Sequence, residues 1–140
     1  MIEAVAFGIG ETLIKDDRGW NSWIDWLGVP RHTLSALVGA VVAQGRDNAD
    51  AIATSAEWGV AKPDPEFFAR ATALTNTAPE HMLHVDDHLH HDTAPAASAG
   101  LRTAHLRRGP YGHFWADGPE AAAADWPIDS LAALPALPAP

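Results

Sequence analysis

Short apolar runs and helical apolar spacing alternate along this chain. Four short apolar runs, bounded by glycine or polar residues, indicate buried strands at residues 3–7, 51–54, 82–85 and 101–106. Apolar positions with helical spacing lie between them, at residues 20–27, 33–43, 67–74 and 93–99. Strands separated by helices usually pair in parallel. The pattern therefore predicts an α/β fold, a small Rossmann-like domain with about four parallel strands.

The length and composition fit one soluble domain. The chain has 140 residues and 47% hydrophobic residues, so we expect a single domain over residues 1–134 and a frayed tail over residues 135–140. The net charge of −9 disfavours nucleic acid and anionic membrane surfaces as partners. No apolar run approaches the ~18 residues of a membrane span, and no secretory signal is evident. With no cysteine, the sequence is consistent with a cytoplasmic protein.

Polar residues with catalytic or ligand-binding chemistry follow the predicted strands. Ligands of parallel α/β sheets bind at the carboxyl ends of the strands, so these residues should converge there. They fall into three stretches, Gly8-Ile-Gly10-Glu-Thr12-Leu13, Val60-Ala-Lys62-Pro63-Asp64-Pro65 and Leu83-His-Val85-Asp86-Asp87 with Asp92.

In this order, the three stretches resemble the first, lysine and acidic motifs of haloacid dehalogenase (HAD)-like hydrolases. The resemblance covers about two-thirds of the chain. It implies a Rossmann-like HAD domain, a carboxylate nucleophile after the first strand, a lysine that screens phosphoryl charge, and Mg²⁺ held by carboxylates.

Two departures from the family pattern argue against its covalent chemistry. Gly8 occupies the nucleophile's place and has no side chain to attack with. Only about forty residues separate Leu13 from Ser55, too few for a cap domain, the second-motif strand and a helix. Asp86 stands where the family motif usually has glycine. The chain therefore gains a carboxylate at position 86 and lacks the family's carboxylate at position 8. We expect Ala51–Thr54 to fill the vacant place beside the first strand and to bring the Thr54 or Ser55 hydroxyl to the site.

The candidate site residues follow from these motifs. The catalytic candidates are Lys62, Asp86, Asp87 and His88, and the metal candidates are Asp86, Asp87 and Asp92, with Mg²⁺ as the implied cofactor. The substrate-binding candidates are Gly8, Gly10, Thr12, Thr54 and Ser55. An acidic motif that no longer binds metal is an equal alternative to a magnesium site. The histidines of residues 84–91 suit a softer metal less well, because adjacent histidines rarely converge on one ion.

Three functions remain open. The first is a repurposed small-molecule-binding protein or a non-covalent acid/base enzyme of cyclase, lyase or isomerase type, as in specialised metabolism. The second is a non-catalytic interaction protein, a pseudoenzyme, and the third is a residual Mg²⁺-dependent phosphatase. Trp20, Trp23 and Trp26 at helical spacing supply large apolar anchors, so we expect a homodimer.

Overall fold

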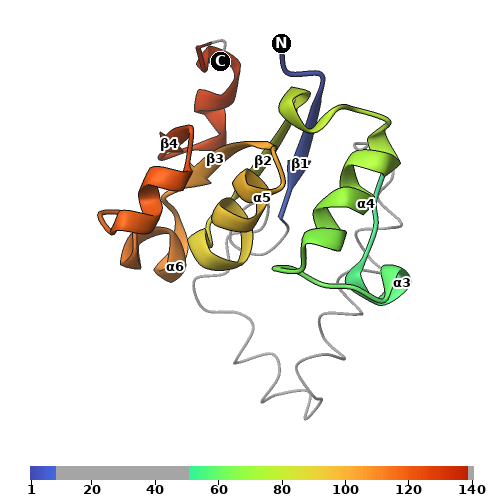
Figure 1. The fold of residues 1–140 in the computed structure, drawn as a ribbon. Helices are drawn as coiled ribbons and strands as arrows, with labels where there is room; N and C mark the ends of the chain where they lie inside the picture. The colour runs from blue at the N-terminus through green and yellow to red at the C-terminus, as the bar shows by residue number, and fades with distance from the viewer. Residues whose placement is uncertain (9–50, 139–140) are drawn as a thin grey trace, which may run out of the picture.

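The protein forms a parallel four-stranded sheet, seen in a computed structural model that describes residues 1–8 and 51–138. The strands are β1 (Ala4–Phe7), β2 (Met82–Asp86), β3 (Arg102–Leu106) and β4 (Trp126–Ile128). Their order in the sheet is β1-β2-β3-β4 (Figure 1). Phe7 pairs with Val85 and Asp86 with His105, so the carboxyl ends of the first three strands lie at one edge. The predicted α/β sheet of about four parallel strands is confirmed.

Within residues 1–8 and 51–138, four α-helices accompany the sheet. They are α3 (Ser55–Trp58), α4 (Pro65–Thr75), α5 (Ala94–Ser98) and α6 (Gly109–Phe114). A π-helical turn at Leu89–Thr93 precedes α5, and short 3-10 helices lie at Pro79–His81, Pro119–Ala123 and Leu131–Ala136. No helix in this described part of the chain is long and apolar enough to cross a membrane.

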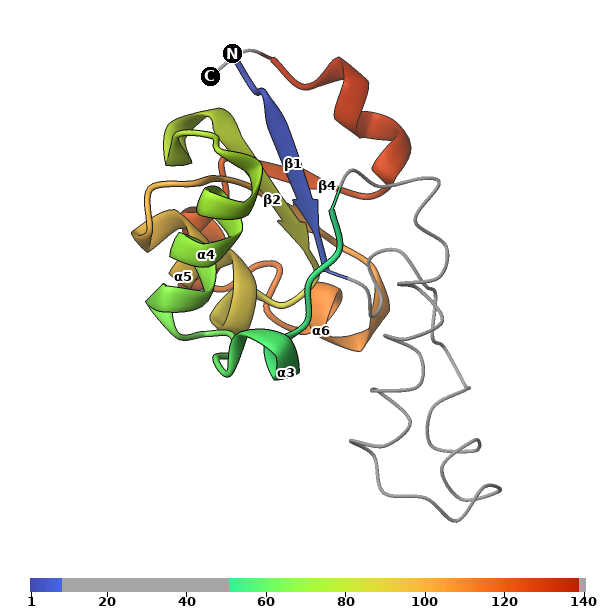
Figure 2. The same cartoon turned by 90° about the vertical axis from the view of Figure 1, so that its right-hand side faces the viewer.

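Side chains that alternate along the strands build a core on each face of the sheet. On one face, Met82 packs with Phe68 of α4 and Ala96 of α5. On the other face, Leu83 and Val85 pack with apolar residues of the carboxyl-terminal segment. Figure 2 shows the sheet between these two layers. Both faces of β2 are therefore covered, and each of its residues from Met82 to Asp86 is buried.

The prediction of a strand at Ala51–Thr54 is wrong. Residues 51–54 form no strand, and in the described ranges β1 pairs only with β2. The fourth strand is instead Trp126–Ile128, beside β3. Thr54 is the N-cap of α3, where its hydroxyl accepts from the Glu57 N–H (3.2 Å) and the Glu57 carboxylate accepts from the Thr54 N–H (2.9 Å). This capping box satisfies polar groups at the helix start.

The first residues of the expected frayed tail belong to a helix. Leu131–Ala136 is helical, and the Ser130 hydroxyl accepts a hydrogen bond from the Ala132 N–H (3.2 Å). Leu134 and Leu137 then pack against the core formed by Leu83 and its neighbours. The segment closes one face of the sheet, because without it that apolar face would meet water.

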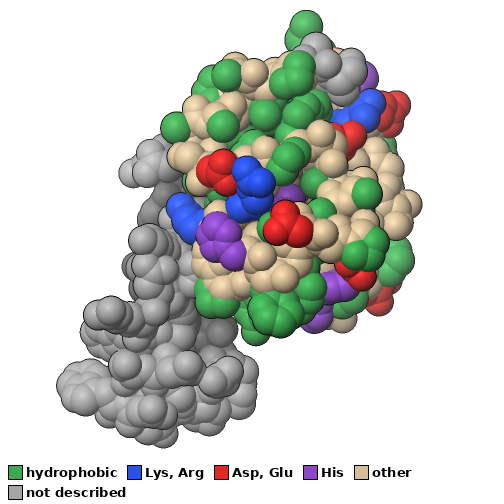
Figure 3. All heavy atoms as spheres, turned by 90° about the vertical axis from the view of Figure 1, so that its left-hand side faces the viewer, with side chains coloured by type: hydrophobic (Ala, Val, Ile, Leu, Met, Phe, Trp, Pro, Cys, Tyr) green, Lys and Arg blue, Asp and Glu red, His purple; other side chains and the backbone are tan. Residues whose placement is uncertain are grey.

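Ion pairs attach the last strand to β3. Arg102 donates to Asp125 (3.0 Å), whose carboxylate also accepts the Thr103 N–H (2.8 Å). Arg107 donates to both carboxylate oxygens of Asp129 (2.8 and 2.9 Å). Lys/Arg and Asp/Glu side chains lie side by side on the face of the molecule in Figure 3.

The role of the carboxyl-terminal segment gives a first prediction. Leu134→Ala should lower the free energy of unfolding by about 1–2 kcal/mol, because a half-buried leucine loses contact with the core. Urea denaturation measures this change. Leu74→Ala is the matched control on an exposed leucine of α4 and should change stability little. Equal effects of the two variants would contradict a core role for the segment.

Candidate functional site

The carboxyl end of β2 supplies most of the candidate site. His84 and Asp86 are alternate residues of this strand and project from the same side of it. The π-helical turn that follows is held by the His88 carbonyl, which accepts from the Asp92 N–H (3.0 Å) and the Thr93 N–H (3.3 Å). This turn brings the Asp92 carboxylate back toward the strand, so His84, Asp86 and Asp92 place ligand atoms within 4.8 Å of one another.

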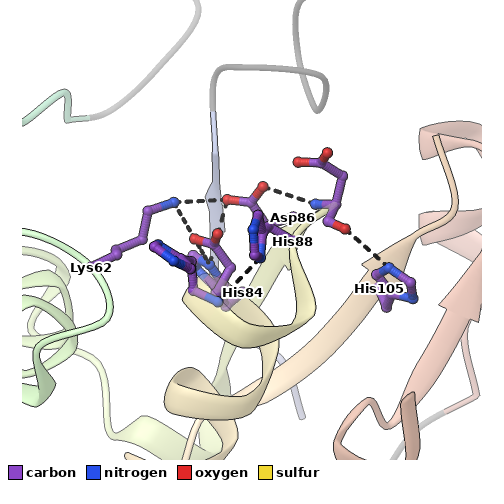
Figure 4. A network of polar contacts seen from close by, with 8 residues as sticks. Lys62, His84, Asp86, His88 and His105 are labelled. Carbon is purple, nitrogen blue, oxygen red and sulfur yellow. Dashed lines mark hydrogen bonds and ion pairs between the residues drawn. The ribbon is translucent and has the colours of Figure 1, made fainter. Parts of the chain in front are cut away.

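Lys62 reaches this group from the loop before α4. The Asp64 carboxylate accepts from the Glu66 N–H (2.9 Å) and Pro65 occupies the first turn, which fixes the start of the helix. The Lys62 Nζ donates to Asp86 Oδ2 (2.9 Å) and also forms an ion pair with the Asp92 carboxylate. Figure 4 shows Lys62, Asp86 and His84 pointing toward one another. The lysine and acidic motifs therefore meet, as the sequence predicted.

The Asp86 carboxylate fills the space that a side chain at Gly8 would occupy. The Gly8 N–H donates to the Val85 carbonyl (3.1 Å), which holds Gly8 against the end of β2. A Cβ atom built on Gly8 would lie 1.9 Å from Asp86 Oδ2 and 2.5 Å from its Cγ. A carboxylate thus remains at this position, but β2 supplies it instead of β1.

The charges of Asp86 and Lys62 stabilise each other. Burial is the largest influence on Asp86 and opposes its ionisation, but the Lys62 ammonium, His84 and the hydrogen bonds from Lys62 and Asp87 together outweigh burial and hold the pKa of that carboxyl well below its usual range. Burial likewise lowers the pKa of Lys62, but the Asp86 and Asp92 carboxylates outweigh it, and the pKa lies above its ordinary value. Asp86 is therefore ionised and Lys62 is positively charged at neutral pH.

Asp87 has the opposite protonation behaviour. Burial and the neighbouring Asp86 carboxylate raise the pKa of Asp87 to about 8. Its backbone N–H donates to Asp86 Oδ1 (2.8 Å), and its carbonyl accepts from His105 Nε2 (3.1 Å). The Asp87 Oδ2 atom is buried without a hydrogen-bond partner among the described residues. A buried carboxyl of this kind retains its proton near neutral pH.

The residues present do not fit a metal ion while Lys62 holds its position. His84, Asp86 and Asp92 would be a reasonable ligand set for a divalent cation. However, the Lys62 ammonium lies beside the carboxylates of this set and already supplies the cation. The sequence grouped Asp87 with Asp86 and Asp92, whereas the group that converges contains His84 in place of Asp87.

The other predicted site residues have separate places. Gly10 and Thr12 lie outside the described residues, as do Trp20, Trp23 and Trp26 and the helix expected at residues 33–43. The Thr54 hydroxyl is engaged with Glu57, and Ser55 is the exposed first residue of α3. The expected delivery of a hydroxyl to the site by a strand at residues 51–54 therefore fails.

Two histidines have roles that the sequence interpretation missed or only partly described. His84 contacts Phe68 edge-on (5.5 Å between ring centroids), as expected for a strand-face contact, and also lies 3.5 Å from Asp92. His105 fixes the Asp87 backbone from the neighbouring strand. The position of His105 in the alternating pattern of β3 was the sequence signal that could have revealed this contact. His88, a catalytic candidate, accepts from the His91 N–H at Nδ1 (3.3 Å).

The shared space of Gly8 and Asp86 generates a prediction. Gly8→Ala should destabilise the fold by about 1–3 kcal/mol, because its methyl group would collide with the Asp86 carboxylate. Asp86→Gly in the same chain should relieve part of this cost, which a double-mutant cycle in urea would record as favourable coupling. Gly118→Ala, whose new methyl group meets the end of the Glu120 side chain, is the control and should show no coupling to Asp86→Gly. Additive effects of Gly8→Ala and Asp86→Gly would contradict a shared position.

A second prediction concerns divalent cations. Millimolar Mg²⁺ or Mn²⁺ should leave the melting temperature of the unaltered protein nearly unchanged, because Lys62 competes for the same carboxylates. Lys62→Met frees those ligands, so Mn²⁺ should raise the melting temperature of this variant through binding to the folded state. A further change, Asp92→Asn, should remove the gain. A large shift with Mg²⁺ in the unaltered protein would show that the ion displaces Lys62.

Known proteins resemble parts of this chain. A glyceraldehyde 3-phosphate phosphatase from Methanopyrus kandleri is 38% identical over 60 residues, covering 43% of this chain and 26% of that protein. A phosphoserine phosphatase from Thermus thermophilus is 35% identical over 82 residues, covering 59% of this chain and 32% of that protein. The matches thus span about a quarter to a third of these relatives.

A solved structure and a family model indicate the same fold. The structure of L-2-haloacid dehalogenase from Xanthobacter autotrophicus superimposes with a TM-score of 0.51 at 21% identity, over 65% of this chain and 44% of that chain. At this identity the likeness concerns the fold alone. The HAD-hydrolase-like family model matches residues 59–134, which include the lysine motif, the acidic motif and all of β2, β3 and β4. This chain belongs to the HAD-hydrolase-like family.

Proposed function

We propose that this protein binds a small molecule and transfers a proton at Asp87 without forming a covalent bond to it. The observation that carries the proposal is a buried carboxyl, Asp87, directly beside the ion pair of Asp86 and Lys62. Asp86 is ionised beside Lys62, whereas burial and Asp86 raise the pKa of Asp87 to about 8. Pairs of carboxyls separated in this way are typical of acid/base sites.

Each charged residue has a distinct role in this proposal. Asp87 is the proton donor or acceptor, since a group that titrates near the working pH transfers protons most effectively. Asp86 keeps Asp87 protonated and orders its backbone N–H. Lys62 remains charged and stabilises negative charge that develops on the bound molecule. Lys62 is the more accessible member of its ion pair, with 26% of its side chain exposed against 5% for Asp86.

The state of Asp86 favours this chemistry over nucleophilic attack. One of its oxygens accepts from the Asp87 N–H and the other from Lys62. A carboxylate whose negative charge is neutralised by two donors and whose pKa is lowered is a poor nucleophile. We therefore assign Asp86 to organise the site.

Proton exchange can be tested without knowledge of the natural substrate. A panel of 2-oxo acids, aldoses and amino acids is incubated with the protein in D₂O, and loss of C–H signals is followed by NMR. We expect exchange into at least one class, and a decrease of roughly 10²–10⁴-fold in Asp87→Asn. Asp117→Asn makes the same chemical change at an exposed carboxyl and should retain the activity. Exchange that survives in Asp87→Asn would contradict the proposed role.

Phosphate-ester hydrolysis is a second candidate, favoured by the position of Asp86. Its carboxylate occupies the place of the absent Gly8 side chain beside Lys62, and the two curated relatives are named as phosphatases. With p-nitrophenyl phosphate we expect turnover near the buffer background. Robust turnover that disappears in Asp86→Asn would favour hydrolysis over the proton-transfer proposal. Absence of both activities would favour a non-catalytic interaction protein.

The pH dependence of folding provides a substrate-free prediction. The pKa of Asp87 is about 8 in the folded protein, above the value of 3.8 for an unperturbed carboxyl, so folding takes up a proton between about pH 4 and pH 8. The proton that Asp87 takes up on folding stabilises the folded state fully below pH 4, and this stabilisation is lost as the pH rises to 8. Relative to Asp87→Asn, the unaltered protein should lose stability with a slope of at most about 1.4 kcal/mol per pH unit. Urea titrations across this range measure it, and a pH-independent difference would contradict the raised pKa.

A further inference from the structure

A histidine of the neighbouring strand contacts the backbone of the proposed acid/base residue. His105 Nε2 lies 3.1 Å from the Asp87 carbonyl oxygen, although the two residues are eighteen positions apart in the chain. Figure 4 shows His105 on its own strand, pointing to this carbonyl. The contact therefore joins β3 to the turn that follows β2.

The Asp87 carbonyl needs a donor from outside its own strand. β2 ends at Asp86, so the next carbonyl lies beyond the end of the hydrogen-bonded strand, and Asp87 is buried. A buried backbone carbonyl without a hydrogen bond destabilises the folded state. His105 pairs with Asp86 in the strand register, which places its side chain beside this carbonyl.

Packing alone does not account for a histidine at position 105. Its neighbours in β3, Ala104 and Leu106, are fully buried, and His105 itself is only 1% exposed. Burial of an imidazole costs free energy unless its polar atoms are hydrogen-bonded. Phenylalanine would fill such a position without that cost, so the hydrogen-bond donor is the property that distinguishes histidine here.

The protonation state of His105 determines which nitrogen donates. Burial has the largest influence on His105 and lowers its pKa, although the hydrogen bond with the Asp87 backbone opposes this change. The neutral ring carries one proton. Because a carbonyl oxygen can only accept, the hydrogen bond requires that proton to be on Nε2.

Both backbone groups of Asp87 are held. Its N–H donates to Asp86 Oδ1 (2.8 Å), and its carbonyl accepts from His105. We call these two hydrogen bonds the Asp87 clamp. The Asp87 Oδ2 atom has no hydrogen-bond partner in residues 1–8 and 51–138. With no hydrogen bond on that oxygen, the direction of the carboxyl depends largely on the clamp.

We propose that His105 is a positioning residue, whose Nε2–H holds the Asp87 backbone and keeps the Asp87 carboxyl beside the ion pair of Asp86 and Lys62. His105 acts through Asp87 in this assignment. Its effect on catalysis rests on the proposed function, because a small displacement of an acid/base group lowers the rate of proton transfer. The clamp itself can be tested without a substrate.

Two substitutions at position 105 separate the donor from the packing. His105→Gln retains an N–H donor on a side chain of similar reach, whereas His105→Phe retains a planar ring and removes the donor. Leu106→Ala is the control, because it removes core packing from the same strand and keeps His105. If His105 only packed the core, His105→Phe and Leu106→Ala would have similar local effects.

Amide hydrogen exchange measured by NMR reports the clamp. The protection of the Asp87 amide relative to the Val85 amide should fall by about five- to tenfold in His105→Phe. This ratio should stay within about twofold of the unaltered value in His105→Gln and in Leu106→Ala. An unchanged ratio in His105→Phe, or an equal decrease in His105→Gln, would overturn the inference.

The tautomer of His105 provides a test that needs no variant. Long-range ¹H–¹⁵N spectra of the unaltered protein at pH 7 should show the His105 proton on Nε2 and none on Nδ1. A proton on Nδ1 would overturn the inference, because Nε2 could then not donate to the Asp87 carbonyl.

Proton exchange in D₂O separates positioning from the proposed chemistry. For a substrate that exchanges, His105→Phe should lower kcat by about tenfold with KM within about twofold, and His105→Gln should recover kcat to within about threefold. An unchanged kcat in His105→Phe would contradict the positioning role. A clamp that weakens in His105→Phe, in a protein that exchanges no substrate, would support the contact and contradict the proposed function instead.

Discussion

The ion pair of Lys62 with Asp86 and Asp92 is the interaction on which the site depends. It joins the loop before α4, the end of β2 and the π-helical turn, three segments that meet only in the folded chain. Buried carboxylates next to each other would repel without a cation between them. The Lys62 ammonium stabilises the two neighbouring carboxylates, and burial together with the neighbouring carboxylates raises the pKa of Asp87 to about 8.

Much of the architecture could be predicted from local sequence. The apolar residues of β2 and β3 and the Lys-Pro-Asp-Pro start of α4 are strong short-range signals, and the structure confirms all three. The last strand was missed because Trp126–Ile128 is three residues long and contains a proline. Its place is fixed by Asp125 and Asp129, whose arginine partners lie more than twenty residues away. Ala51–Thr54 had strand-like composition, but the capping box of Thr54 starts a helix immediately after it.

The candidate site was predictable in composition but not in geometry. The order of the motifs along the chain was enough to predict that Lys62, Asp86 and Asp92 lie together. The overlap between Asp86 and the space at Gly8 depends on strand register and could be seen only in three dimensions. The stacking of Tyr111 on Trp115 was not predicted, because both residues lie in a glycine- and proline-rich stretch that gave no helical periodicity. Sequence patterns report which face of an element is buried, whereas contacts between distant turns need the fold itself.

The overlap of residues 8 and 86 also constrains the history of the protein. An aspartate at position 86 cannot coexist comfortably with a side chain at position 8, where a Cβ atom would lie 1.9 Å from the carboxylate. An ancestor with the usual family residues would therefore have had to lose its first-strand aspartate before, or together with, the gain of Asp86. Once both changes were fixed, returning either position alone would be disfavoured. Each of the two residues therefore limits which side chain the other position can hold.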